Sequence, residues 1–221
     1  MTEIKTLIIN YSNRLKQKEI SMFRGAVIAS IGEENVLLHN HVGEGYRYAY
    51  PEIQYKSMDE KATIVAINKG IDSVRKLCLT DMLDIHLGNV AVTLNLASAV
   101  IAHTDMTFCQ EMKNYTITSW LPLNQENYKT YKNCEDMISR IEMLQRTLTG
   151  NIISMAKGLD IHLEERIELK IINIREQKPV IFKRQNMMAF NAVFAVNMVL
   201  PSFIGLGKGS SLGFGTIKEL S

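Results

Sequence analysis

Two histidines separated by a single residue form a pair that could transfer protons. His39 and His41 follow directly on the apolar run 36–38. Imidazole titrates near neutral pH, so small differences in environment can make one ring a base and the other an acid. Such a pair suits RNA cleavage, in which one group accepts the proton of the attacking ribose 2′-OH and another protonates the leaving 5′-oxygen. The same pair could also be ordinary surface polarity or half of a metal site.

The residues after the histidines combine aromatic and basic side chains. The run 46–48 (Tyr-Arg-Tyr) offers rings that stack on bases and a guanidinium that binds phosphate. A donor or cation near the non-bridging phosphate oxygens would stabilise the charge that develops during cleavage. Tyr48, Lys56 and Lys208 are the candidates, and no metal is needed in this scheme. Taken singly, Arg24 and Lys56 would be solvated surface charges.

A glycine-rich segment lies close to the C-terminus. Five of the 13 glycines of the chain fall within residues 205–217, and Lys208 lies among them: Gly205, Gly207, Gly209, Gly213 and Gly215. Such a loop can present successive N–H groups to an anion. The nucleotide-binding P-loop spacing fails, because Lys208 is followed by Gly209 and Ser202 occupies the position of the first glycine. The dinucleotide fingerprint would need a further helix and strand, and the segment leaves no room for them. Two interpretations remain, namely a loop that grips a phosphate backbone and a plain flexible turn.

Apolar periodicity predicts the elements that must position these residues. In the first half we expect the order β, α, β, β, α, β, over residues 4–11, 19–31, 53–57, 63–67, 71–79 and 90–102. In the second half we expect a strand, a long helix, a hairpin around Glu176 and Gln177, and a strand leading into the glycine loop, over residues 115–121, 135–156, 168–174 with 179–183, and 189–200. The first order is ferredoxin-like, and the second half is compatible with an altered copy of it. The sequence therefore predicts an α+β protein of two ferredoxin-like (RRM-like) domains, residues 1–106 with the histidines and residues 107–221 with the glycine-rich loop.

Composition is that of an ordinary globular protein. Hydrophobic residues make up 46% of the chain, and the formal net charge is +2, so any basic surface must be local. Three scattered cysteines give no disulfide framework and indicate a reducing cytoplasm. No signal peptide or membrane span is apparent. Additional metal ligands would have to come from residues without characteristic spacing, such as Cys78, His86, His103 and Cys109.

Taken together, these segments resemble the CRISPR-associated endoribonucleases that cut precursor CRISPR RNA within each repeat. The residues that carry the resemblance are Phe23-Arg24-Gly25-Ala26, His39-Asn40-His41, Tyr46-Arg47-Tyr48, Tyr50-Pro51-Glu52-Ile53-Gln54-Tyr55-Lys56 and the loop from Gly205 to Gly215. The resemblance implies tandem ferredoxin-like domains with a central cleft, metal-independent cleavage without a cofactor, and 2′,3′-cyclic phosphate and 5′-OH ends.

The resemblance also implies roles for individual residues. His39 and His41 would carry the acid–base chemistry, with Tyr48 assisting, and the assignment of base and acid stays open. We assign RNA binding to a larger set: Arg24, Arg47, Lys56, Gly205, Gly207, Lys208, Gly209, Gly213 and Gly215. CRISPR repeat RNA is the expected partner, while a homodimer and association with a CRISPR effector complex stay open and no membrane partner is expected. The alternatives are a repeat-RNA-binding module that does not cut, and a metal-dependent hydrolase that uses the His-x-His pair.

Overall fold

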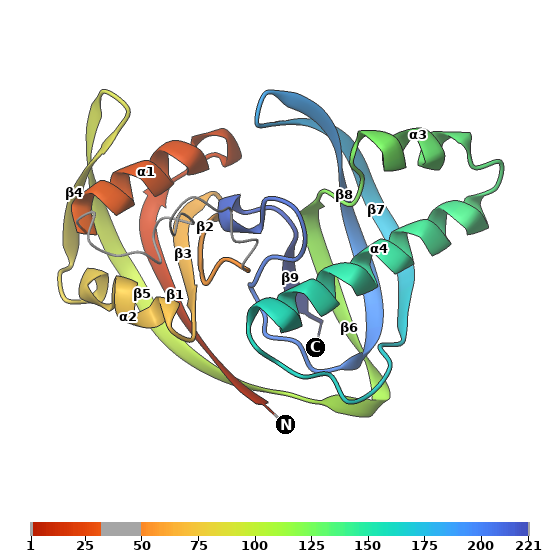
Figure 1. Cartoon of the computed structure of the whole chain (residues 1–221). Coiled ribbons are helices and arrows are strands. Elements are labelled where there is room, and N and C mark those ends of the chain that lie inside the picture. Colours follow the sequence, from red (N-terminus) through yellow and green to blue (C-terminus); the bar gives the residue numbers. More distant parts are fainter. Residues whose placement is uncertain (1, 32–49, 221) are drawn as a thin grey trace, which may run out of the picture. The chain divides into compact units, whose positions relative to one another are not determined.

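The computed structural model describes residues 2–31 and 50–220, and the chain folds into two compact units (Figure 1). The N-terminal unit comprises the described part of Glu3–Thr104 together with the tripeptide Ser211–Gly213. The C-terminal unit comprises Asp105–Ser210 and the residues from Phe214 onward, with Thr2. Three residues of the glycine-rich segment thus belong to a different unit from their neighbours in sequence.

A five-stranded sheet forms the N-terminal unit, in the order β2-β3-β1-β5-β4. The strands are β1 (Thr2–Arg14), β2 (Ile53–Met58), β3 (Lys61–Ile67), β4 (Met82–Leu87) and β5 (Val90–Met106). The helical segments are η1 (Gln17–Glu19), α1 (Ile20–Ile31), α2 (Gly70–Val74) and η2 (Arg75–Cys78). With β4 set aside, the order β2-β3-β1-β5 is the ferredoxin order that the sequence predicts.

Local sequence accounts for the β2–β3 hairpin. Met58 pairs with Lys61, so two residues make the turn, and both have positive φ, 49° at Asp59 and 58° at Glu60. Such a turn matches the twist of the strands that it joins. The turn lies where the sequence predicts it. The prediction missed β4, although Gly88, whose φ is 64°, and the following residue also make a two-residue connection to β5.

Helix α1 covers one face of this sheet through residues spaced three and four apart. Ile20, Phe23, Ala26 and Val27 are its buried side chains. The Phe23 ring meets Tyr11 of β1 and Tyr55 of β2 edge to face, with centroid separations of 6.4 and 5.8 Å. This geometry is the favourable one for aromatic pairs, and it fixes β2 next to the helix.

The C-terminal unit repeats the same strand order with different connections. Its strands are β6 (Phe108–Trp120), β7 (Leu169–Phe182), β8 (Gln185–Met198) and β9 (Thr216–Glu219), in the order β7-β8-β6-β9. Between β6 and β7 lie α3 (Gln125–Asn133) and α4 (Met137–Gly158), and between β8 and β9 lies η3 (Ser210–Leu212). The glycine-rich segment therefore takes the place of the second ferredoxin helix. The prediction of an α+β protein with two ferredoxin-like units is confirmed.

The hairpin predicted around Glu176 and Gln177 is wrong. Strand β7 runs through both residues, and the turn lies at Lys183 and Arg184, where φ is 48° and 64°. Pro179 is tolerated within β7 because this strand lies at the edge of the sheet, where a missing N–H need not break a ladder. Two irregularities of register let β7 bend, between Ile171 and Asn173 and between Ile174 and Glu176.

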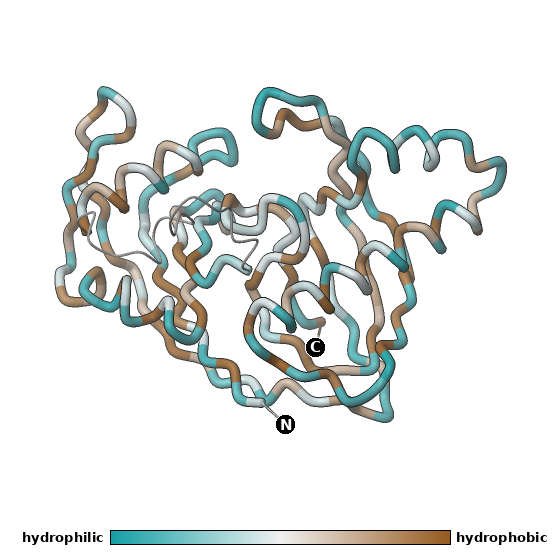
Figure 2. The backbone as a smooth tube through the Cα atoms, viewed as in Figure 1, coloured by the Kyte–Doolittle hydropathy of each residue, from teal (hydrophilic) through white to brown (hydrophobic). Residues whose placement is uncertain are grey.

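The two helices of the C-terminal unit differ in how visible they are in the sequence. The helix predicted at residues 135–156 is α4, which buries Leu144, Leu148 and Ile152 on one stripe. The indole N–H of Trp120 donates to Asn151 Oδ1 at 2.9 Å and ties this helix to β6. The prediction missed α3, because this helix is polar and Tyr131 is its one buried residue. Figure 2 shows the contrast between hydrophilic α3 and the more hydrophobic strands.

Within residues 2–31 and 50–220, no helix combines the length and apolar character needed to cross a membrane.

Candidate functional site

The glycine-rich segment is closed by backbone hydrogen bonds and buried side chains. The Leu206 N–H donates to the Gly215 carbonyl at 2.8 Å, and the Phe214 N–H donates to the Gly209 carbonyl at 3.3 Å. Ile204 and Leu206 are fully buried. The shape of the loop is thus built into the fold of the C-terminal unit, so the loop is preformed and is not a plain flexible turn.

Glycine is required at Gly209, because the loop runs against an aromatic ring there. Its φ is +77°, a value that L side chains rarely adopt. A Cβ on Gly209 would lie 2.8 Å from Cε2 of Phe182 and 3.0 Å from Cδ2 of Phe214. The rings of Phe182 and Phe214 meet edge to face, with their centroids 5.3 Å apart. The loop backbone therefore packs directly on an aromatic pair.

Two lysines share the ring of Phe182. The Nζ atom of Lys208 lies 5.7 Å from the ring centroid, and the Nζ atom of Lys183 lies 5.8 Å from it. The face of an aromatic ring attracts cations. Phe182 therefore gathers positive charge from the loop and from the β7–β8 turn, in a chain whose net charge is only +2. A local field of this sign favours a phosphate group.

The tripeptide Ser211–Gly213 carries the loop into the N-terminal unit. The side-chain amide of Gln17 donates to the Leu212 carbonyl at 3.1 Å, and the Leu212 side chain packs on the hydrophobic core of that unit. Gly213 has a φ of +80°, and a Cβ there would lie 2.8 Å from Cδ1 of Ile20. The same Cβ would lie 3.4 Å from the Cα atom of Lys56. This part of the loop thus lies against β2.

Lys56 is buried in β2, beneath the loop. It is 1% exposed, so the expectation of a solvated surface charge is wrong for this residue. Burial lowers the pKa of Lys56 to about 7, because the ammonium group loses its contact with water. Near neutral pH the side chain is therefore divided between a cation and a neutral amine, and it can donate or accept a proton.

Arg24 lies near the aromatic residues of the same unit. It stands half-buried in α1, directly after Phe23. Burial raises the pKa of Tyr55 to about 12, and the charge of Arg24 opposes that rise. Among the described residues, the Tyr55 and Tyr11 hydroxyls have no hydrogen-bond partner. The structure thus places three of the predicted RNA-binding residues, Arg24, Lys56 and Gly213, in one unit, with Tyr55 near all three.

The predicted catalytic residues lie outside the described residues. This applies to His39, His41 and Tyr48, and also to Arg47. Their roles stay predictions. Among residues 2–31 and 50–220, no three His, Cys, Asp or Glu side chains are grouped as ligands for a metal ion.

The sequence did not point to two residues that hold the loop. Phe182 could have been found, because it directly precedes the basic pair Lys183 and Arg184 that the true hairpin turn contains. Gln17 gave no signal, because its contact with the Leu212 carbonyl joins residues that are distant in sequence.

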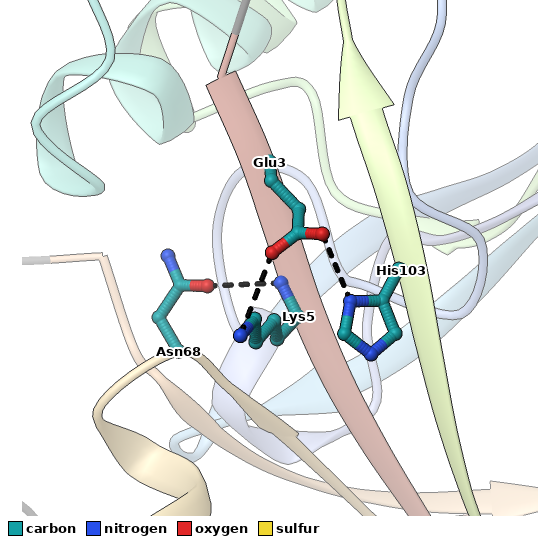
Figure 3. A network of polar contacts seen from close by, with 4 residues as sticks. All are labelled: Glu3, Lys5, Asn68 and His103. Atoms are coloured by element: carbon teal, nitrogen blue, oxygen red, sulfur yellow. Dashed lines mark hydrogen bonds and ion pairs between the residues drawn. The ribbon is translucent and has the colours of Figure 1, made fainter.

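His103 belongs to a polar network that joins β1 and β5, two neighbouring inner strands of the N-terminal sheet (Figure 3). The Nδ1 atom of His103 lies 3.0 Å from Oε1 of Glu3, and the Nζ atom of Lys5 lies 3.5 Å from Oε2 of the same carboxylate. The backbone N–H of Lys5 also donates to Asn68 Oδ1. The hydrogen bond to His103 first, and then the positive charge of Lys5, lower the pKa of Glu3. The network is exposed and joins β1 to β5 through the contact between Glu3 and His103.

Comparison with known proteins identifies both halves of the chain. Residues 2–105 match the model of the Cas6b N-terminal domain, and residues 107–220 match that of the Cas6b C-terminal domain. A crystal structure of Cas6b is 31% identical over 99% of this chain and 100% of that one, with a TM-score of 0.87. A crystal structure of the CRISPR RNA processing endoribonuclease Cas6b is 30% identical over the same shares of the two chains, with a TM-score of 0.74.

Other relatives match more weakly or over part of the chain. An uncharacterized protein of Methanocaldococcus jannaschii is 35% identical over 101 residues, which are 46% of this chain and 67% of that protein. The type IV crRNA endonuclease Csf5 is 8% identical with a TM-score of 0.60, which indicates a shared fold. The matches to the two domain models and to the two Cas6b structures span nearly the whole sequence, and the chain belongs to the Cas6b family.

Proposed function

We propose that this chain is an endoribonuclease that cleaves CRISPR repeat RNA and so matures guide RNA. The observation that carries the proposal is the match of both Cas6b domain models, over residues 2–105 and 107–220. The solved relative at 30% identity is a CRISPR RNA processing endoribonuclease, and it aligns over 99% of this chain. A relative that shared the fold alone would not support an activity, but this one also shares sequence along the whole length.

The proposed chemistry uses the histidine pair and needs no metal. The ribose 2′-OH attacks the adjacent phosphorus, and its proton passes to one imidazole of His39 and His41. The P–O5′ bond breaks, and the other imidazole protonates the leaving oxygen. The products are a 2′,3′-cyclic phosphate and a 5′-OH. Each well-placed proton transfer contributes roughly 10²- to 10⁴-fold in rate, and Tyr48 assists by donating to a non-bridging oxygen.

The proposed RNA grip draws on residues from the glycine loop and from the N-terminal unit. In the C-terminal unit, Lys208 supplies positive charge beside Phe182, and the preformed loop offers backbone N–H groups. In the N-terminal unit, Arg24 and Lys56 are the cationic candidates. Lys56 carries full charge only below a pH of about 7, so its contribution to phosphate binding falls as the pH rises.

The test is cleavage of end-labelled repeat RNA from the CRISPR array of the same genome, in the presence of EDTA. We expect the wild type to cut at one position per repeat and to leave a 2′,3′-cyclic phosphate. His39→Ala and His41→Ala should each slow cutting at least a hundredfold. His86→Ala, which removes an exposed imidazole from β4, is the matched control and should cut normally.

Three outcomes would reject parts of this proposal. Undiminished cutting by the double histidine variant would remove the pair from the mechanism. Loss of all cutting in EDTA would point to the metal-dependent alternative. Tight binding of repeat RNA without any cutting by the wild type would identify a binding module.

A further inference from the structure

We propose that a cavity in the C-terminal unit binds one unpaired nucleobase of the RNA. This inference rests on the function proposed above and adds a base-binding site to it. The cavity lies between the start of α3 and the β7–β8 hairpin, and its volume is ≈ 150 Å³. Ten residues line it: Leu123, Asn124, Gln125, Tyr128, Pro179, Gln185, Asn186, Met187, Met188 and Lys208.

The size of the cavity suits a single aromatic ring. A protein cavity of about this volume is known to accept benzene, whereas sites for whole drug-sized ligands measure roughly 300–1,000 Å³. The apolar part of the lining consists of Leu123, Pro179, Met187 and Met188, and Tyr128 adds an aromatic side chain. A lining of this kind favours a planar base, because an aromatic side chain can stack on a base and polarisable thioethers make favourable contacts with aromatic rings.

The polar part of the lining suits the edge of a base. Gln125, Gln185 and Asn186 are exposed, and within the described residues their side-chain amides make no hydrogen bond. An amide carries a donor and an acceptor side by side, which is the pattern that matches a base edge. Proteins that read RNA by sequence take up unstacked bases in this way. A duplex base would not reach the cavity, so the occupant must be unpaired.

Lys208 links the cavity to the glycine-rich loop. It lines the cavity, and its Nζ atom also lies 5.7 Å from the ring centroid of Phe182, a ring that Lys183 approaches to 5.8 Å. A nucleotide whose base enters the cavity would therefore carry its phosphate toward these two lysines. The loop and the cavity then hold neighbouring parts of the same strand, one by charge and one by shape.

The experiment combines abasic substitutions in the RNA with variants of the cavity. The probe is the repeat RNA, made as a series with one abasic nucleotide at each position in turn; where the wild type cuts the repeat, the probe also carries a 2′-deoxy nucleotide at the cleavage position. Binding is measured for the full-length wild type, for Gln125→Ala and Asn186→Ala combined, and for Met188→Trp, which fills the cavity. Gln110→Ala, an exposed amide on β6, is the matched control.

We expect one abasic position to weaken wild-type binding about tenfold. Both cavity variants should weaken binding of the intact RNA by a similar factor and should lose sensitivity to that one position. Gln110→Ala should behave as the wild type. If the amide double variant, whose changes are exposed and whose thermal stability is checked, keeps the full abasic profile, the inference is overturned.

The outcome can be separated from that of the proposed function. Normal cutting by the wild type, together with an unchanged abasic profile in both variants, would reject the cavity and leave the endoribonuclease in place. A position-specific loss that disappears in the variants, without any cutting by the wild type, would support the cavity and reject the enzyme.

Discussion

Replacement of Gly213 by alanine should destabilise the N-terminal unit, because two costs add at this position. A φ of +80° costs a residue with a Cβ roughly 1–2 kcal/mol relative to glycine. The new Cβ would also lie 2.8 Å from Cδ1 of Ile20. Ile20 is itself fully buried, so it would have to leave its rotamer at a cost of about 0.5–1.5 kcal/mol. The expected loss is therefore about 1.5–3.5 kcal/mol.

The matched control is Gly150→Ala. Gly150 lies inside α4, and a Cβ there would meet no atom within 4 Å. Alanine is favoured over glycine in a helix interior by roughly 0.5–1 kcal/mol, so this change should stabilise the protein. The two variants thus make the same chemical change with opposite expected signs.

The assay is urea unfolding followed by two signals. Far-UV circular dichroism reports both units, whereas fluorescence of Trp120, the one tryptophan of the chain, reports the C-terminal unit. Since the urea dependence of small domains is about 1–3 kcal/mol per M, Gly213→Ala should lower the midpoint seen by circular dichroism by about 1 M or more. An unchanged midpoint for Gly213→Ala, or a lowered one for Gly150→Ala, would refute this reasoning.

Three further predictions concern charges and a helix cap. Burial lowers the pKa of Lys56 from 10.5 to about 7, so between these two pH values the unfolded chain keeps a proton that the folded chain has released. The free energy of unfolding should therefore rise with pH over this range in the wild type and not in Lys56→Met. Urea unfolding in a pH series measures this. If Lys208 neutralises one phosphate, Lys208→Ala should reduce the slope of log K against log salt concentration by about 0.7 for binding of single-stranded repeat RNA. An unchanged slope in a salt titration would show that Lys208 does not contact phosphate. Asp136 accepts hydrogen bonds from the Ser139 N–H and hydroxyl, and these lower its pKa. Its carboxylate therefore stabilises α4 at pH values above its ordinary pKa, and this stabilisation is lost as the pH falls through the lowered pKa. Thermal melts at acid pH should show the loss in the wild type and not in Asp136→Asn, and equal acid sensitivity of the two proteins would contradict the prediction.

The sequence predicted the elements whose signals are local. The turn at Asp59 and Glu60 lies between the strands predicted at residues 53–57 and 63–67, and α4 follows from the stripe through Leu144, Leu148 and Ile152. The true turn at Lys183 and Arg184 was missed, because Glu176 and Gln177 break the apolar pattern of β7 although they lie within it. An exposed edge strand does not need that pattern, so periodicity gave the wrong turn.

The site was less accessible to sequence reasoning, because its geometry is set by contacts between distant residues. The glycine count indicated an unusual loop, and the positive φ at Gly209 and Gly213 agrees with that expectation. The burial of Lys56, however, depends on how other parts of the unit pack around β2, and the sequence of β2 alone does not predict it. The seating of Leu212 on the N-terminal core joins positions far apart in the chain, and no local rule could have found it.

The placement of Ser211–Gly213 in the N-terminal unit has a consequence for synthesis on the ribosome. The N-terminal unit needs a peptide that is translated only after the whole segment Asp105–Ser210 of the other unit, since Ser211–Gly213 follow that segment in the sequence. When only residues 1–104 have emerged from the ribosome, the hydrophobic core of this unit lacks its contact with Leu212. The core reaches its final packing only after Ser211–Gly213 have also been synthesised. A fragment that contains only residues 1–104 would stay in this incomplete state, because it lacks the residues 211–213 that belong to the same unit.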